Sequence, residues 1–273
     1  MGRERSPRIF EPGYYDRLRE IERRHWWSRG MRRAMAALLE PHLAKAGPLR
    51  VLDAGCGTGV HLESARRWRL AGPPVGLDIA PEAIEHAGTR GIASLVRGDA
   101  SELPFRAGAF DLVLCVDTIQ HLSPGAAGRV VAEIRRVLRP GGLVYLRTNS
   151  ALGHAPLRGI DPERYRRYDV PSVVALVETA GLEVLRATYL NAVPGMWGAL
   201  LERMRGPREA PPGGPALSIR PYPGWLTWLD RGLGAVLSGE ALLLGRLGLD
   251  LPFGHSTATV ARRPGLDPGS AGS

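Results

Sequence analysis

The sequence predicts an α/β fold in which a mostly parallel sheet is covered by helices on both faces. Short apolar runs, which are typical of buried strands, alternate along the chain with segments of helical periodicity. A glycine-rich turn follows the first of these runs, and an acidic residue follows each of the next two. With 273 residues, 44% of them hydrophobic, the chain is long enough to bury a full core.

The turn after the first apolar run carries three glycines spaced two apart, in the sequence Val-Leu-Asp-Ala-Gly-Cys-Gly-Thr-Gly of residues 51–59. Glycine permits positive φ and lets a ligand approach the backbone, and the helix predicted over 60–68 presents unpaired N–H groups. The turn is therefore a candidate site for an anionic group. In the dinucleotide fingerprint the third glycine stands one position later than Gly59, so the spacing argues against NAD.

The next two predicted strands each lead into an acid. Residues 75–78 end at Asp78, about 20 residues after Gly59, which is near the offset expected of a ribose-binding carboxylate. The third strand is predicted over 94–96, and Asp99 follows it in a loop. Each acid has an alternative interpretation, because Asp78 could cap the next helix and Asp99 could be an ordinary turn residue.

The remaining elements follow the same logic of apolar runs and turn residues. Strands are predicted over 110–116, 182–190 and 251–262, and a helix over 171–180. Residues 138–146 predict the end of a helix, then a Pro-Gly-Gly turn and a further strand. Residues 14–43 predict one or two amphipathic helices, and residues 196–204 and 225–247 predict two helices joined by a connector rich in Pro and Gly.

We therefore expect five parts along the chain. They are an N-terminal helical cap (1–48), a core (49–193), a helical insertion or lid (194–250), the final core strand (251–263) and a disordered tail (264–273).

Taken in order, the motifs of residues 49–150 resemble those of the class I S-adenosylmethionine (SAM) methyltransferases, in particular the bacterial small-molecule enzymes of type 11. The resemblance implies a Rossmann-like, seven-stranded, mostly parallel sheet and SAM as the cofactor. It places the methionine end of SAM at the glycine turn, the ribose hydroxyls on Asp78 and the adenine amino group on Asp99. The other core positions that it assigns to cofactor binding are Asp53, Gly55, Cys56, Gly57, Gly59, Ile79, Ala100 and Val116. For Asp53, orientation of the glycine loop is the alternative to direct contact.

The segment before the first strand has a dense aromatic and basic centre over 22–33. It resembles a pre-core segment in which a Trp and a downstream Arg help to close the cofactor pocket. The matching positions are Trp26 or Trp27 and Arg32 or Arg33, of which we choose Trp27 and Arg32, with the guanidinium pairing with the methionine carboxylate. The alternative is that the tryptophans pack the helix onto the sheet.

Methyl transfer from a sulfonium is an in-line displacement, so the resemblance implies that the protein mainly aligns a nucleophile and excludes water. A general base is needed only for a nucleophile that is protonated at neutral pH. His121 is the candidate catalytic residue and His154 a second one, because both follow strands at the carboxyl edge of the sheet. Packing of the next helix is the alternative for His121. The basic aromatic run 161–169 could line a pocket for an anionic substrate or form a solvated loop.

The net charge of +9 first suggests a nucleic acid or an anionic membrane as partner. However, Lys45 is the only lysine, which is typical of GC-rich codon usage, and the arginines are spread along the chain, so nucleic acid is not expected. Cys56 and Cys115 predict no disulfide framework, and no Cys/His cluster predicts a metal. With no visible signal peptide, and with charges interrupting the apolar stretch 226–251, we expect a cytoplasmic protein without a transmembrane span.

We therefore expect SAM-dependent O-, N- or C-methylation of a small molecule, apolar or anionic, in secondary metabolism. Four alternatives stay open: an RNA methyltransferase, a binding protein on the same fold, a SAM enzyme that catalyses another reaction, and an NAD(P)-dependent oxidoreductase. The glycine spacing disfavours the last of these.

Overall fold

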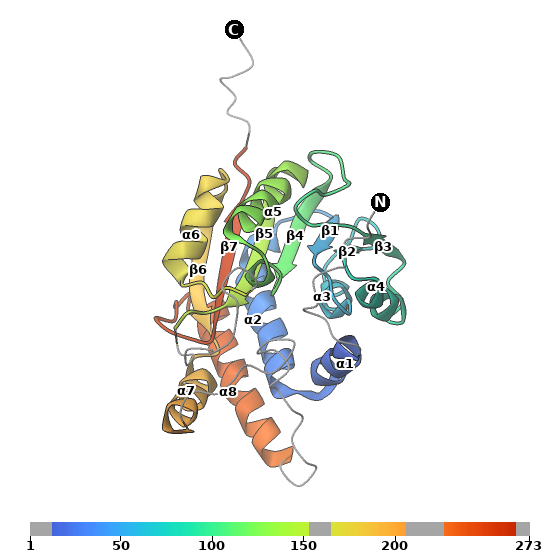
Figure 1. The fold of residues 1–273 in the computed structure, drawn as a ribbon. Helices are drawn as coiled ribbons and strands as arrows, with labels where there is room; N and C mark the ends of the chain where they lie inside the picture. The colour runs from blue at the N-terminus through green and yellow to red at the C-terminus, as the bar shows by residue number, and fades with distance from the viewer. Residues whose placement is uncertain (1–12, 153–164, 206–226, 266–273) are drawn as a thin grey trace.

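The computed structural model describes residues 13–152, 165–205 and 227–265, which form a seven-stranded sheet with helices packed against it (Figure 1). The strand order is β3-β2-β1-β4-β5-β7-β6, and only the pairs that involve β7 are antiparallel. The predicted mostly parallel α/β sheet is therefore confirmed. The strands are β1 (Val51–Ala54), β2 (Val75–Asp78), β3 (Ser94–Arg97), β4 (Phe110–Val116), β5 (Leu138–Asn149), β6 (Glu183–Leu190) and β7 (Ser256–Arg262).

Two separate cores lie on the two faces of the sheet. In β4, Leu112 and Leu114 belong to one core, and Val113 and Cys115 belong to the other, because successive side chains of a strand point to opposite faces. One core is covered by α5 (Pro124–Val137) and α6 (Val170–Thr179), and the other by α2 (Trp26–Leu43) and α8 (Thr227–Arg246). The remaining helices are α1 (Tyr14–Arg24), α3 (Val60–Ala65), α4 (Pro81–Gly88), the 3-10 turn η1 (Ile119–His121) and α7 (Ala192–Arg205).

The N-terminal segment forms two helices because the chain is extended at His25, where φ is −77° and ψ is 135°. The Nδ1 atom of His25 accepts the Trp27 N–H at 3.2 Å, so this side chain caps α2. The break lets α1 turn away from α2 and pack against α4, where Tyr14 and Tyr15 are buried with Ala83.

Several predicted boundaries are wrong, including the start of α7, which lies at Ala192 rather than near residue 196. Helix α3 ends at Ala65 rather than at residue 68, and β5 begins at Leu138, with a register irregularity opposite Phe110 that lets the strand continue through the Pro-Gly-Gly sequence. β7 begins at Ser256 because the backbone of Gly254 approaches Leu190 too closely for regular pairing; a Cβ there would lie 2.3 Å from the Leu190 carbonyl oxygen.

Several predicted features lie outside the described residues. They are His154, the first part of the basic aromatic run, the connector between α7 and α8, and the tail from residue 266. Across the three ranges that are described, no helix is long and apolar enough to cross a membrane.

Helix α8 packs along α2 and so joins the predicted insertion to the N-terminal cap (Figure 1). Small residues allow this close approach: Gly30 faces Leu237, and Gly245 faces Ala37. A Cβ at position 30 would lie 2.4 Å from Leu237 Cδ1 and 2.6 Å from its Cβ. Because a Cβ atom cannot swing aside, the two helices would have to separate to admit it.

We therefore expect Gly30→Ala to lower the free energy of unfolding by about 1 to 3 kcal/mol through overpacking. Gly232→Ala on α8 is the matched control, because a Cβ there meets nothing within 4 Å. It should be neutral or stabilising by up to about 1 kcal/mol. Urea unfolding of both variants measures the difference, and equal stabilities would contradict the close α2–α8 packing.

Candidate active site

The site begins at the glycine-rich loop between β1 and α3. The N–H groups of Gly55 and Cys56 donate to the Leu77 carbonyl at 2.8 and 2.9 Å, which fixes the loop against β2. Gly55 has a φ of 88°, and a Cβ there would lie 2.2 Å from Thr118 Oγ1. Gly57 has a φ of 52°, and a Cβ there would meet nothing within 4 Å. The loop is therefore packed shut at Gly55 and open at Gly57, where a ligand can approach the backbone.

Asp78 stands at the end of β2 with its carboxylate against this loop. Its Oδ2 accepts the Gly57 N–H at 2.9 Å, and its Oδ1 accepts the Ala80 N–H at 3.0 Å. Burial raises the pKa of Asp78, and the N–H groups of Ala80 and Gly57 oppose that rise. Each oxygen keeps a further lone pair, so Asp78 can accept hydroxyl groups while it holds the loop.

Asp53, at the carboxyl end of β1, is completely buried, and neither carboxylate oxygen has a hydrogen-bond partner among the described residues. Burial, reinforced by the nearby charges of Asp78 and Glu22, raises the pKa of Asp53 to about 8, and Arg147 acts in the opposite direction. An unpaired buried carboxylate is costly. Asp53 accepts no N–H of the glycine loop. It is a candidate to receive a cationic group of a ligand, but because it is completely buried, the side chains that cover it would first have to move aside.

The aromatic and basic residues of α2 make different contacts. The backbone N–H of Trp26 donates to the Asp230 carboxylate on α8 at 2.9 Å, and the Arg33 side chain donates to the Ser238 hydroxyl on α8 at 2.6 Å. These two residues therefore belong to the contact between α2 and α8. The structure does not bring them to the glycine loop.

Trp27 and Arg32 have separate sets of contacts. The guanidinium carbon of Arg147 lies 5.3 Å from the centre of the Trp27 ring, in a cation–π contact. Arg32 donates to the Ser28 hydroxyl at 2.6 Å and to the Glu22 carbonyl at 3.3 Å. Burial lowers the pKa of Arg32, and Glu22 opposes that effect. Of the two predicted pairs, the structure places this one beside the residues that face the loop.

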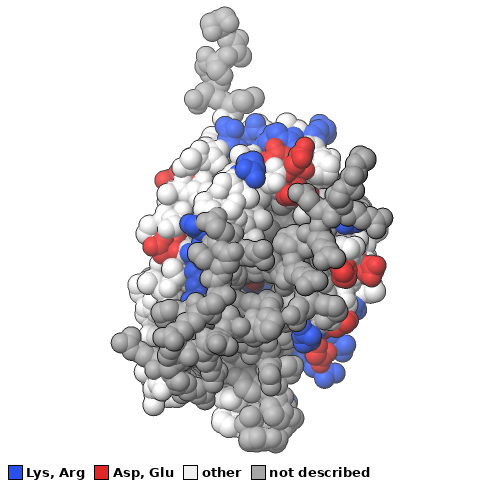
Figure 2. Space-filling model, in the orientation of Figure 1, with Lys and Arg blue, Asp and Glu red and all other residues white. Residues whose placement is uncertain are grey.

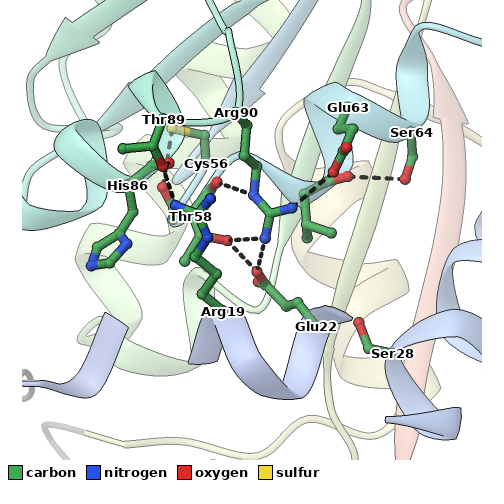
Figure 3. Close-up of polar contacts among 12 residues, drawn as sticks. Arg19, Glu22, Ser28, Cys56, Thr58, Glu63, Ser64, His86, Thr89 and Arg90 are labelled. Carbon is green, nitrogen blue, oxygen red and sulfur yellow. Dashed lines mark hydrogen bonds and ion pairs between the residues drawn. The ribbon is translucent and has the colours of Figure 1, made fainter. Parts of the chain in front are cut away.

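A buried polar cluster joins α1 to the glycine loop (Figure 3). Glu22 accepts hydrogen bonds from Arg90 Nη2 at 2.8 Å and from the Thr58 hydroxyl. Arg90 also donates to the Thr58 carbonyl at 2.7 Å and to Glu63 at 2.8 Å. Figure 3 shows the Glu22 side chain pointing from its helix toward the Arg90 guanidinium. Because only 8% of the Arg90 side chain and 9% of the Glu22 side chain are exposed, this pair ties α1 to the loop from within.

The loops after β2, β3 and β4 supply the other end of the site. Asp99 is exposed, and its Oδ1 accepts the Ser101 N–H at 2.7 Å, which leaves its second oxygen open. Ile79 exposes 44% of its surface beside Asp78, so its side chain is available to an apolar group of a ligand. Ala100 is half-buried in the β3 loop, and Val116 is buried at the end of β4.

Two further predicted positions contribute through the backbone. The Cys56 side chain is buried with Leu62 and Ile92 beneath the loop, so only its main chain is available to a ligand. Burial raises the pKa of the Cys56 thiol, which is therefore not a nucleophile. Gly59 is the N-cap of α3 and has no side chain to cover the helix terminus.

Comparison with known proteins agrees with this geometry. Residues 51–142, which include the loop, Asp78 and Asp99, match the family described as a methyltransferase domain. This match lies within the core and does not extend to the helices before β1 or to β6 and β7. A protein of Encephalitozoon cuniculi named as a methyltransferase is 41% identical over 132 residues, which cover 47% of this chain and 56% of that protein.

A second relative is the ubiquinone biosynthesis O-methyltransferase of Xanthomonas oryzae pv. oryzae, 30% identical over 155 residues, which cover 51% of this chain and 62% of that protein. The chain thus matches little more than half the length of these curated relatives. The solved structure of a SAM-dependent methyltransferase from Archaeoglobus fulgidus shares the fold, with a TM-score of 0.54 and 18% identity over 91% of this chain and 99% of that chain.

The sheet carries a buried ion pair at the ends of β4 and β5. Asp117 is paired with Arg147, whose side chain is only 3% exposed. Asp117 has a φ of 54°, a left-handed conformation that is uncommon for a residue other than glycine. The pair lies between Trp27 on α2 and the turn that carries His121.

His121 ends η1, and its ring centre lies 5.5 Å from that of Tyr165. Burial lowers the pKa of His121 to about 4, and the charge of Asp117 opposes that shift. The imidazole is therefore neutral at pH 7 and can accept a proton. The neighbouring Gln120 has a packing role, since its side-chain oxygen accepts the Thr148 hydroxyl at 3.1 Å and the Asn149 N–H at 3.0 Å.

Four features of the candidate site were not predicted from the sequence. They are the Glu22–Arg90 pair, the Asp117–Arg147 pair, the hydrogen bond from the Asn149 amide to the Tyr165 hydroxyl, and the burial of Tyr14 and Tyr15 near Asp78. Only the Tyr-Tyr dipeptide at the start of α1 offered a local signal. No group of three or more His, Cys, Asp or Glu side chains that could hold a metal occurs in the described ranges.

Figure 2 shows basic side chains beside acidic ones along the upper edge of the face drawn and again near α1. On the described part of this face the charges are therefore mixed in sign. This distribution agrees with the even spread of arginines along the sequence.

Proposed function

We propose that this protein transfers the methyl group of SAM to a small-molecule acceptor by in-line displacement. The observation that carries the proposal is the pairing of an open glycine loop with Asp53, a fully buried carboxylate that has no partner among the described residues. SAM has a cationic amino group and an anionic carboxylate at its methionine end. The amino group of SAM would therefore pair with Asp53, and its carboxylate would pair with an anion-binding group beside Asp53.

The residues present fit this cofactor along its whole length. Asp53 would hold the amino group and Arg32 the carboxylate, while Asp78 would accept the ribose hydroxyls with its free lone pairs. Ile79 would cover the adenine ring, and the open oxygen of Asp99 would meet the adenine amino group. Bound SAM supplies a methyl group that is already activated by a positive sulfur atom.

The protein's own residues would then orient the acceptor and receive its proton. His121 is neutral at physiological pH, so its imidazole can take a proton from an acceptor hydroxyl that loses it on methylation. Because its pKa is about 4, His121 can only assist a proton transfer that is already favourable. Acceptors with acidic hydroxyl or carboxyl groups therefore suit this site best.

Oxygen is the acceptor atom that we favour, because the named O-methyltransferase relative acts in ubiquinone biosynthesis. We assign α1 and α2 (within 1–48) to a cap over the cofactor. We assign α8 and α7, which begins at Ala192, to the insertion predicted over 194–250, which would shape the acceptor side. We place the protein in the cytoplasm, because its two cysteines, Cys56 and Cys115, are free thiols and cytoplasmic conditions keep thiols reduced. We place its reaction in secondary metabolism.

Product analysis tests the reaction. The protein is incubated with SAM and a panel of phenols, carboxylic acids and amines, and S-adenosylhomocysteine is followed by mass spectrometry. Formation of S-adenosylhomocysteine together with a methylated acceptor is the expected result. If SAM binds but is never consumed across the panel, and the protein instead converts a substrate without methylating it, the enzyme uses this fold for another reaction.

We expect Asp78→Ala to weaken SAM binding by roughly 1 to 3 kcal/mol, because it removes acceptors of buried hydroxyl groups and the anchor of the Gly57 N–H. Equilibrium dialysis measures the affinity. Asp16→Ala on α1 is the control, since that carboxylate is 77% exposed and only touches His86. Equal affinities for the two variants would remove Asp78 from the cofactor site.

A further inference from the structure

Large apolar side chains are exposed in one region of the described structure. Of the 14 that are exposed there, only Ile79 and Leu152 lie outside residues 193–253. Scattered exposed apolar residues need no explanation, but a concentrated set marks a surface that is covered by something. The twelve others are Val193, Met196, Trp197, Leu200, Met204, Trp228, Val236, Leu242, Leu243, Leu247, Leu249 and Phe253.

On α7 the exposed residues form a single stripe. Val193, Met196, Trp197, Leu200 and Met204 follow the spacing that puts side chains on one face of a helix, and each is at least 50% exposed. This arrangement is the reverse of an ordinary surface helix, whose apolar stripe faces the core.

On α8 the exposed apolar residues lie opposite the buried face. Leu237, Ala241 and Leu244 are buried, whereas Trp228, Leu242 and other apolar residues point outward. The two helices are fixed to each other, because buried Glu240 on α8 accepts the N–H groups of Ala192 and Val193 at the start of α7, at 3.3 and 3.0 Å. The two apolar faces therefore belong to one rigid part of the fold.

Among the side chains that the structure describes on α7 and α8, the exposed charges without an ion-pair partner are positive. Each acidic side chain of α8 and of the turn after it has a partner within the protein. Asp230 pairs with Arg29, Glu240 accepts backbone N–H groups, and Asp250 pairs with Arg186. Arg231 and Arg246, by contrast, are exposed on the same side of α8 as Trp228 and Leu242, and neither forms an ion pair with another described residue. The protein as a whole carries a charge of +9.

From this combination we infer that the outer faces of α7 and α8, which we call the α7–α8 surface, bind an anionic lipid bilayer. Apolar and tryptophan side chains would enter the boundary between headgroups and acyl chains, and Arg231 and Arg246 would contact the lipid phosphates. Such binding lies parallel to the membrane and needs no spanning helix. It goes beyond the proposed methyl transfer and does not depend on it.

Vesicle flotation of the full chain tests the inference. With vesicles of phosphatidylcholine and phosphatidylglycerol, wild type should float with the lipid, and high salt or pure phosphatidylcholine should weaken binding. Trp197→Glu/Leu200→Glu should lower the partition coefficient by about tenfold or more, and Arg231→Glu/Arg246→Glu should lower it on anionic vesicles. Ala132→Glu on α5, an exposed position remote from this surface, is the control for an added negative charge elsewhere on the protein and should bind as wild type does.

Circular dichroism and SAM affinity of each variant show whether it is folded, so a loss of binding is assigned to the surface only where both match wild type. Wild type that stays with the lipid-free fraction would overturn the inference. So would equal partitioning of wild type and Trp197→Glu/Leu200→Glu. Analytical ultracentrifugation addresses the remaining outcome: a wild-type dimer that this variant converts to a monomer would show that a second copy of the chain covers the surface instead.

Discussion

Replacing Asp53 by Asn is expected to stabilise the cofactor-free protein at pH 8 and to remove most of its affinity for SAM. The folded-state pKa of Asp53 is raised to about 8, so between its usual pKa and pH 8 the folded protein retains a proton that the unfolded chain releases. Stability contributed by this group is therefore lost as pH rises through that window. The neutral amide removes the loss, and we expect a gain of about 2 kcal/mol at pH 8, reduced from the full linkage value because the amide is also unpaired.

The pH dependence of wild type separates Asp53 from the histidines. Burial lowers the pKa of His25 and of His121 to about 4, so both make the protein more stable as pH rises from about 4 to 6.5. Their contribution still rises for about one pH unit above 6.5, until the histidines of the unfolded chain have lost their protons. Asp53 is therefore reported by the difference between the two proteins: urea unfolding at pH 6.5 and 8 should show a larger fall in the free energy of unfolding for wild type than for Asp53→Asn.

Binding of SAM to Asp53→Asn should be weakened by about 2 to 4 kcal/mol, because the buried carboxylate is the proposed partner of the cofactor's amino group. In wild type, binding at pH 7 should release a proton, which calorimetry in two buffers of different ionisation enthalpy detects. The control is Asp16→Asn on α1, whose carboxylate is 77% exposed, and both its stability and its SAM affinity should be unchanged. If Asp53→Asn bound SAM as wild type does, Asp53 would not hold the amino group.

Arg90→Met should destabilise the protein by about 3 to 5 kcal/mol, because it leaves the buried carboxylate of Glu22 without its cation. The change also removes the hydrogen bonds from Arg90 to the Thr58 carbonyl and hydroxyl, at 2.7 and 3.2 Å, so the glycine loop loses its support. SAM affinity should fall along with stability. Urea unfolding and equilibrium dialysis measure the two effects.

Two comparisons make this prediction specific. The double variant Glu22→Leu/Arg90→Met should be more stable than Arg90→Met alone, because no uncompensated charge stays buried. Arg262→Met removes a surface pair with Glu183, in which the two side chains are 44% and 50% exposed, and should cost about 0 to 1 kcal/mol. If Arg90→Met cost no more than Arg262→Met, the pair would not hold α1 to the loop.

The sheet and the glycine loop could be predicted because their signals are local. The strand at 110–116 is almost wholly apolar, and the three glycines of 55–59 sit where the backbone needs positive φ. The end of β2 was predicted for the same reason, since Asp78 directly follows a short apolar run. The strand order, by contrast, was implied by family resemblance, because periodicity alone does not order strands.

The buried charge pairs could not be predicted, because their partners lie far apart in the sequence. Glu22 and Arg90 come from α1 and the end of α4, and each looks like an ordinary surface charge in its own segment. The choice between Trp26 and Trp27 could not be made from the sequence for the same reason. It depends on where α8 packs, and nothing near residue 26 indicates that Asp230 will receive its N–H.

The most direct test of the proposed cofactor site is isothermal titration calorimetry of the full chain with SAM near pH 8, with NAD titrated in parallel. We predict saturable binding of one SAM per chain, weakened in Asp53→Asn and Asp78→Ala, and no heat of binding with NAD. Absence of binding at high micromolar SAM, or binding that both variants leave unchanged, would contradict the assignment of these carboxylates and of the loop between them.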